Sequence, residues 1–350
     1  MREQSRVSSA ECNLGIYVSY LLGEPLGASC RRLGVVMSLS HDSVNRFLLR
    51  EDYTPEDLLK EVRGKINPVG VVLSIDDTVI DKHYSKKKTE LIDYYWSNKD
   101  KRVMLGVNLV TLYATDSNEV GVPINYRICK KEEGKTKHDY FREMLKEVKQ
   151  SGVEIKYVTG DSWYASVENF KFLREEGLGF LFGIERIRKV SLERGKEQQV
   201  QTVDIPAQGL VCYLPKFGEV KIFKRMFKEE YRYYVLYSPD SVVLKMFKED
   251  DFITLHNTHW KIEQYHRILK QVCNLEHFQV RKETAIRNHI FSSLCGYLVL
   301  AIQKAAGEII NHYEIKYRLF LETIARFVRQ NPLTSFLNCA HSLFYTTVNA

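Results

Sequence analysis

The sequence predicts an α/β protein with a mixed five-stranded sheet, flanking helices, a helical segment before the sheet and a β-rich insertion. Three observations predict it. Between residues 67 and 185, apolar strand-like runs and helical segments follow in the order strand, strand, strand, helix, strand, helix, strand. Residues 1–66, and the chain from about 250 onward, have helical periodicity. Residues 186–249 hold short alternating pieces between turns, and 350 residues exceed one ordinary core.

The bulk composition is that of a globular chain, with 44% hydrophobic and 27% charged residues. We find no apolar run of the roughly 18–20 residues that a membrane span needs, and no signal-peptide core, so we expect a cytoplasmic protein without membrane contact. Seven cysteines, an odd number without a CxxC pair, favour reduced thiols. The net charge of +7 permits a polyanionic partner without demonstrating one.

Residues 1–66 are predicted to form a helical DNA-binding domain. A short helix, a turn containing Gly34 and a second helix capped by Ser40 or Asp42 have helix-turn-helix spacing. An ordinary helical bundle is the alternative. A further helix begins at Pro55, with Thr54 as its N-cap. The second helix would present to DNA the polar side chains Ser43, Asn45, Arg46 and Arg50.

A buried-type strand, 71–78, ends in two adjacent carboxylates, Asp76 and Asp77. Charges at the tip of such a strand require a reason, because burying them is costly. The basic run Lys86, Lys87 and Lys88 follows it, either as a solvated loop or as a contact for a phosphate backbone. The next two strands, 103–114 and 120–128, are expected to pair as a hairpin.

Asp161 follows the strand 155–160 and precedes a helix. Ligands of α/β sheets gather at the carboxyl ends of strands, so Asp161 is a candidate site residue. Taken singly, a helix-capping role is an equally simple explanation.

Glu263 lies on a helix with one apolar face and one polar stripe. The structural alternative is a solvated face with an i,i+4 ion pair between Glu263 and Arg267. A zinc site of His256, His259 and Glu263 is a second alternative. At 100° per residue the stripe holds His256, His259, Glu263, His266, Arg267 and Lys270.

Each acidic motif alone is weak evidence for a metal site. Together, three carboxylates at two strand tips and one helix face suit a pair of hard divalent cations. Oxygen-only sites favour Mg²⁺ or Mn²⁺. Two such ions can activate a water or a 3′-hydroxyl group and stabilise the leaving oxygen of a phosphodiester.

The motifs Ile75-Asp76-Asp77-Thr78, Gly160-Asp161 and Trp260-Lys261-Ile262-Glu263 with Lys270 resemble those of DDE transposases of bacterial insertion sequences. The superfamily called insertion sequence four has the third motif Tyr-x2-Arg-x3-Glu-x6-Lys. The glutamate and lysine match here, whereas the tyrosine and arginine positions hold His256 and His259. The resemblance covers about 70–310 and implies a ribonuclease-H-like core of residues 67–185 and 250–310. Residues 186–249 would be its insertion and 311–350 a helical tail.

The resemblance implies metal-dependent cleavage of transposon ends, followed by attack of the freed 3′-hydroxyl on target DNA. Asp77, Asp161 and Glu263 would hold two Mg²⁺ (or Mn²⁺), because the family's metal-binding aspartate directly precedes threonine. Asp76 is the alternative, since it shares a pleat face with polar Ser74. The partners would be inverted-repeat double-stranded DNA and a second copy of the chain. The DNA contacts would be Lys270, Arg267, His259, His256, Lys86, Lys87, Lys88, Arg46 and Asn45.

Two other functions are compatible with this pattern. One is a non-catalytic, transposase-derived regulatory protein that binds DNA, which retention of all three acids disfavours. The other is a ribonuclease-H-like nuclease that cuts branched DNA.

Overall fold

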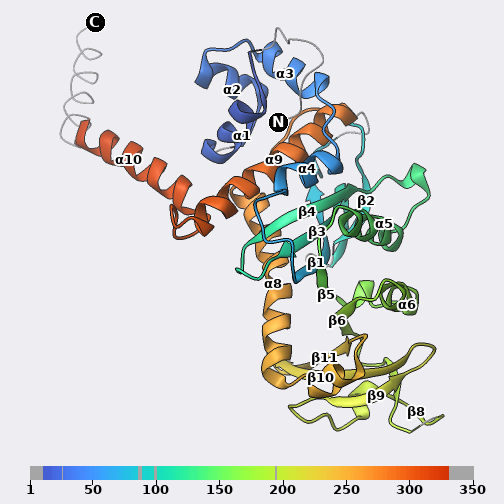
Figure 1. Cartoon of the computed structure of the whole chain (residues 1–350). Helices are drawn as coiled ribbons and strands as arrows, with labels where there is room; N and C mark the ends of the chain where they lie inside the picture. Colours follow the sequence, from blue (N-terminus) through green and yellow to red (C-terminus); the bar gives the residue numbers. More distant parts are fainter. Residues whose placement is uncertain (1–10, 26, 86–88, 98–100, 194, 331–350) are drawn as a thin grey trace, which may run out of the picture.

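The structure is a computed structural model that describes residues 11–25, 27–85, 89–97, 101–193 and 195–330. Four short helices precede the sheet, and three longer ones follow it (Figure 1). The helices are α1 (Leu14–Gly23), α2 (Cys30–Met37), α3 (His41–Arg50), α4 (Pro55–Val62), α5 (Lys137–Gln150), α6 (Val167–Glu175), α7 (Ser241–Met246), α8 (Glu249–Gln271), α9 (Glu283–Ala305) and α10 (Glu314–Gln330), with 3-10 turns η1 (Lys131–Glu133), η2 (Ser162–Tyr164) and η3 (Val200–Thr202).

The described strands form one mixed sheet in the order β2-β3-β1-β5-β6-β11-β10-β9-β7-β8, with β4 pairing on β3. Strand β1 is antiparallel to β3 and parallel to β5, and β5 is parallel to β6. The strands are β1 (Val71–Asp81), β2 (Asp93–Ser97), β3 (Arg102–Thr115), β4 (Gly121–Ile128), β5 (Ile155–Gly160), β6 (Gly179–Ile184), β7 (Lys189–Ser191), β8 (Glu197–Gln199), β9 (Leu210–Leu214), β10 (Gly218–Phe227) and β11 (Glu230–Tyr237).

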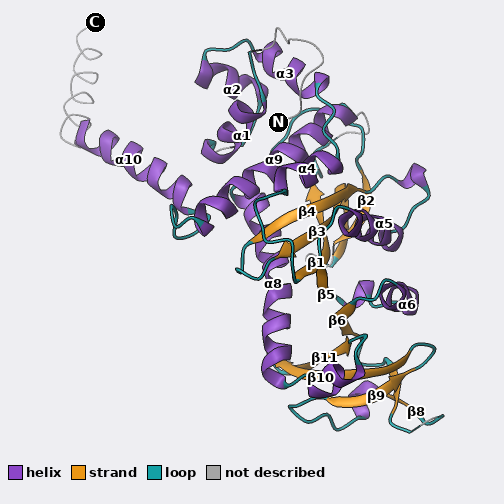
Figure 2. Cartoon of the chain, in the orientation of Figure 1, coloured by secondary structure: helices purple, strands orange, loops and turns teal. Residues whose placement is uncertain are grey.

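The five strands predicted from apolar runs are β1, β3, β4, β5 and β6, and the predicted hairpin of β3 with β4 is present. The sheet is larger than predicted, because β11 pairs antiparallel with β6 and so continues the core sheet into the insertion (Figure 2). Strand β2 was not predicted. Its residues 93–97 lie within a charged stretch, and they pair antiparallel with β3, the next strand along the chain.

The two faces of the central strands are covered by different helices. Helix α8 packs against β1 and β5, whereas α5 packs against β3 and β4 and α6 against β6. The buried core runs continuously from these strands into α8 and α9. Consecutive residues of β1 point to opposite faces, so its two aspartates meet different surroundings.

The N-terminal helices pack on α9 through buried polar contacts as well as apolar ones. The side chain of Asn288 donates to the carbonyl oxygens of Leu48 and Glu51, and it accepts the backbone N–H of Tyr53 at 3.1 Å. The sequence predicted that Ser43 would be presented to DNA, but its side chain is buried within the protein. It is 2% exposed, and its hydroxyl oxygen accepts backbone N–H groups that precede α1.

We expected no segment long and apolar enough to span a membrane, but α9 is such a segment. By length and composition alone Glu283–Ala305 could do so, but 83% of its apolar window is buried within the fold, as in the core helix of a globular domain. Helix α10 leads away from the body of the molecule (Figure 1). Its sequence places Tyr317, Phe320, Ile324 and Phe327 on one exposed stripe.

Candidate active site

Asp76 of β1 lies level with Asp161, which directly follows the end of the neighbouring parallel strand β5. Ile75 of β1 pairs in register with Gly160 of β5, so the next residue of each chain segment is an aspartate at the same level. In-register residues of adjacent strands share a face. Asp76 therefore shares the face covered by α8, where Ser74 and Thr159 also meet, with 2.8 Å between their hydroxyl oxygens.

The surroundings of Asp76 come from α8. Its Oδ2 lies 3.4 Å from Nδ1 of His266, and its Oδ1 accepts the backbone N–H of Asp77 at 2.8 Å. Burial acts to raise the pKa of Asp76, but the contact with His266 and the proximity of His259 outweigh it, so this pKa lies below its ordinary value. Asp76 is thus held in its charged form.

Asp77 points to the opposite face of β1, where its carboxylate forms an ion pair with Lys137. Its Oδ2 accepts from Nζ of Lys137 at 2.6 Å and from Nδ2 of Asn108 at 2.8 Å, and its Oδ1 accepts from the hydroxyl of Tyr164 at 3.4 Å. The side chains of Asp77 and Lys137 are 13% and 23% exposed. The ion pair between Asp77 and Lys137 therefore has a structural role.

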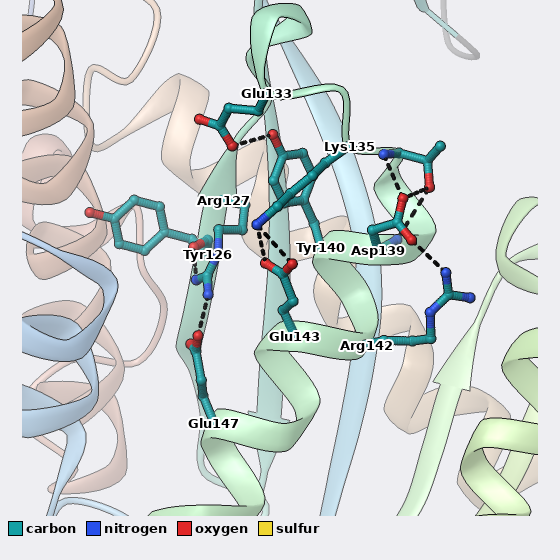
Figure 3. A network of polar contacts seen from close by, with 10 residues as sticks. Tyr126, Arg127, Glu133, Lys135, Asp139, Tyr140, Arg142, Glu143 and Glu147 are labelled. Carbon is teal, nitrogen blue, oxygen red and sulfur yellow. Dashed lines mark hydrogen bonds and ion pairs between the residues drawn. The ribbon is translucent and has the colours of Figure 1, made fainter.

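A capping box positions Lys137 for this contact. Thr136 caps α5 and exchanges hydrogen bonds with Asp139, which also holds Arg142 at 2.6 Å (Figure 3). An ion pair between Arg127 of β4 and Glu147 ties the same helix to the sheet (Figure 3). The start of α5 is therefore fixed on the Asp77 face.

Asp161 is both a helix cap and a member of the carboxylate group. Its Oδ1 accepts the backbone N–H of Trp163 at 3.0 Å, which begins η2 as the capping alternative anticipated. Burial, and then the charges of Asp76 and Asp77, raise its pKa to about 7. The strand end needs Gly160, because a Cβ there would lie 2.4 Å from Phe182 and 2.8 Å from Ile75.

Glu263 faces the same cleft as Asp161. Partial burial, and then the charge of Asp76, raise its pKa. The cleft has a volume of about 700 Å³ and opens between the carboxyl ends of β5 and β6, the strands β10 and β11, and α8. The charge of Asp76 thus raises the pKa of both Asp161 and Glu263, whereas Asp77 is not among the charges that shift Glu263.

The zinc alternative is not supported by the arrangement of the histidines. Both ring nitrogens of His256 are engaged, one by Arg225 at 2.9 Å and the other by Tyr234 at 3.0 Å. Nδ1 of His259 lies 3.2 Å from the hydroxyl of Thr159. Among the residues that the structure describes, no three His, Cys, Asp or Glu side chains stand close enough to hold a metal ion as they are placed.

The predicted DNA contacts are dispersed. Lys270 is turned inward, donating to the carbonyl oxygen of Val79 at 2.7 Å and pairing with Glu276 at 2.8 Å. Arg267 is exposed on α8, and Arg46 is exposed on α3, where Asn45 is half-buried. Lys86, Lys87 and Lys88 lie outside the described residues. Sequence reasoning missed Lys137, Arg225 and Tyr234, which only the tertiary structure brings to the carboxylates and the cleft.

Comparisons with known proteins show the family and the fold of this chain. A family model described as the transposase DDE domain matches residues 67–299, about two thirds of the chain. A solved structure of the piggyBac transposase synaptic complex with hairpin DNA is similar in fold. Its TM-score is 0.54 with 14% identity, over 94% of this chain and 75% of that one.

A second solved structure, the Drosophila P element transposase strand transfer complex, has a TM-score of 0.30 with 12% identity, over 55% of this chain and 48% of that one. No curated protein sequence matches the chain. The family match spans all three acidic motifs and the helix that follows them. The chain therefore belongs to the transposase DDE domain family and is a DNA transposase.

Proposed function

We propose that Asp76, Asp161 and Glu263 hold two Mg²⁺ (or Mn²⁺) ions and catalyse cleavage of transposon ends followed by strand transfer. Enzymes of this family use divalent metal ions. The observation that carries the proposal is that Asp161 and Glu263 line one cleft, and that the charge of Asp76 on β1 raises the pKa of both.

The chemistry of this donor set fits a hard divalent cation. The raised pKa values of Asp161 and Glu263 reflect burial and repulsion from the charge of Asp76, which a bound cation would relieve. The three side chains supply oxygen ligands only, as Mg²⁺ and Mn²⁺ prefer. Such ions would supply Lewis-acid activation of the attacking and leaving oxygens.

Asp76 replaces Asp77 in this assignment. The motif resemblance favoured Asp77, but Asp77 is engaged by Lys137 and Asn108 on the opposite face of β1. The register of β1 with β5 supports Asp76, since it brings Asp76 level with Asp161.

Three further features belong to the same proposal. The sheet order β3-β1-β5-β6 with helices on both faces supports a ribonuclease-H-like core. The short turn between α2 and α3 supports a helix-turn-helix role for the N-terminal helices. The similar piggyBac complex contains DNA, which supports inverted-repeat duplexes as the partner, bound by two copies of this chain.

Cleavage of the DNA that flanks the gene tests the proposal. Wild-type protein should nick duplexes that carry the flanking inverted repeats when Mg²⁺ is added, and it should join the freed 3′ ends to a target plasmid. Asp161→Ala should bind the same duplex without cutting it.

A control with branched DNA separates the rival functions. Cleavage of any junction without strand-transfer products would indicate a structure-specific nuclease. Binding without cleavage by the wild type would indicate a regulatory protein. Cleavage that survives in Asp161→Ala would contradict the carboxylate assignment.

A further inference from the structure

Strands β10 and β11 bring cationic and aromatic side chains onto the wall of the cleft that holds Asp161 and Glu263. Arg225 and Tyr234 line this cleft, together with Arg232, whose guanidinium carbon lies 3.7 Å from the ring centroid of Phe227. They face α8 across the opening and belong to the insertion, not to the predicted acidic motifs.

His256 of α8 joins two of these side chains. Its Nδ1 lies 2.9 Å from Nη1 of Arg225, and its Nε2 lies 3.0 Å from the hydroxyl oxygen of Tyr234. A guanidinium group can only donate hydrogen bonds, so Nδ1 must accept. The imidazole is therefore neutral and carries its proton on Nε2, which donates to the oxygen of Tyr234. Burial, and then the charge of Arg225, lower the pKa of His256 to about 4, in keeping with a neutral ring.

This assignment determines what the two partners can do. Because the oxygen of Tyr234 accepts from His256, its own O–H is left to donate into the cleft. Arg225 uses one N–H on His256 and has four more. The charged side chains of the cleft also affect the pKa of Tyr234. Its pKa is raised mainly by burial, with Glu263 adding to the rise and Arg232 and Arg225 opposing it.

A guanidinium and a hydroxyl donor beside a group of carboxylates form a site for an anion that must approach those carboxylates. We propose that Arg225 and Tyr234 bind a DNA phosphate at this cleft, and that His256 is a positioning residue that holds both donors. The inference rests on the proposed function, since it takes the anion to be the DNA backbone. His256 occupies the tyrosine position of the resembling third motif, so here the insertion would supply the phenol and guanidinium groups.

The salt dependence of DNA binding tests this without any catalytic step. The probe is a fluorescent duplex carrying the DNA that flanks the gene, titrated in EDTA at several salt concentrations. The slope of log K against log[salt] changes by about 1 for each phosphate that no longer meets a protein cation. Arg225→Ala should reduce the slope by that amount, whereas Tyr234→Phe should weaken binding with the slope unchanged, because a neutral donor releases no counterion.

Two substitutions of His256 separate positioning from a simple effect on folding. His256→Phe removes the acceptor and should reproduce the slope of Arg225→Ala. His256→Gln offers an amide oxygen to Arg225 and should restore most of the wild-type slope. Lys196→Ala is the control, since Lys196 is an exposed insertion residue paired with Glu193 and absent from the cleft lining. Thermal unfolding of each variant verifies the fold.

The outcomes distinguish this inference from the proposed function. An unchanged slope for folded Arg225→Ala would overturn the phosphate contact. A wild-type slope for His256→Phe would overturn the positioning role. A wild-type protein that shows the expected slopes but never cleaves would instead refute the proposed catalysis. Absence of any binding to the flanking duplexes would overturn both.

Discussion

Substituting the two aspartates of β1 one at a time distinguishes the metal ligand from the aspartate of the structural ion pair. Asp76 and Asp77 are adjacent in sequence, but one meets Asp161 and α8 while the other meets Lys137 and α5. We expect Asp76→Asn to lose cleavage and retain stability, and Asp77→Asn to lose stability and retain cleavage in the folded fraction.

The size of the stability loss follows from the contacts of Asp77. Its carboxylate accepts one charged and two neutral hydrogen bonds at 2.6, 2.8 and 3.4 Å, and it is 13% exposed. Asparagine keeps one acceptor oxygen but removes the charge that Lys137 requires. Hydrogen bonds to charged groups contribute about 1.5–3 kcal/mol each, so Asp77→Asn should lower the free energy of unfolding by roughly 2 kcal/mol.

Asp76→Asn should behave differently in both measurements. Its carboxylate raises the pKa values of Asp161 and Glu263, so removing its charge relieves repulsion there. This gain opposes the loss of the charged contact with His266, so the stability of the metal-free protein should change little. A ligand of a catalytic metal stabilises the transition state by several kcal/mol, so cleavage should fall by at least about a hundredfold.

Two assays decide the matter. Chemical denaturation in EDTA gives the free energies of unfolding, and single-turnover cleavage of a flanking duplex in Mg²⁺ gives the rates. The rise in melting temperature on adding Mg²⁺ should persist in Asp77→Asn and disappear in Asp76→Asn. Normal cleavage by Asp76→Asn, together with a stable but inactive Asp77→Asn, would refute the reasoning and return the ligand to Asp77.

Two further predictions concern pH and the docking of the N-terminal helices. The pKa of Asp161 is raised from 3.8 to about 7 in the folded protein, so its contribution to stability is present below about pH 4 and is lost as the pH rises through 7. In EDTA the melting temperature of Asp161→Asn should therefore rise relative to wild type between pH 4 and 8, and parallel curves would contradict this. Asn288→Ala removes the buried hydrogen bonds that the Asn288 side chain donates to the carbonyl oxygens of Leu48 and Glu51, and should cost about 2–4 kcal/mol. Faster limited proteolysis of α1–α4 would reveal it, and an unchanged cleavage pattern would count against this docking contact.

The sequence predicted the central strands well because each is a local signal. Short segments rich in apolar and β-branched residues define β1, β5 and β6 without knowledge of their neighbours. Thr54 and Pro55 likewise predicted the start of α4, and the capping box is present there. Strand β2 was missed because its polar and aromatic residues form no apolar pattern, and they become a strand through pairing with β3.

The choice between Asp76 and Asp77 shows where local signals run out. Pleat alternation established that the two side chains face opposite ways, and Ser74 indicated the more polar face. Sequence alone could not say which helix covers each face, because that depends on the crossovers between distant strands. Once α8 covers the Ser74 face, Glu263 lies on the same side of the sheet as Asp76, whose charge raises its pKa, and this favours Asp76 as the proposed ligand.

The neighbours of His256 could not be predicted from the sequence. Arg225 and Tyr234 lie 31 and 22 residues before His256, too far for any periodicity to link them. Their contact exists because β11 pairs with β6 and thereby carries β10 and β11 over the polar stripe of α8. In this chain, therefore, the pairing of one insertion strand with the core sheet determines which side chains meet the carboxylates.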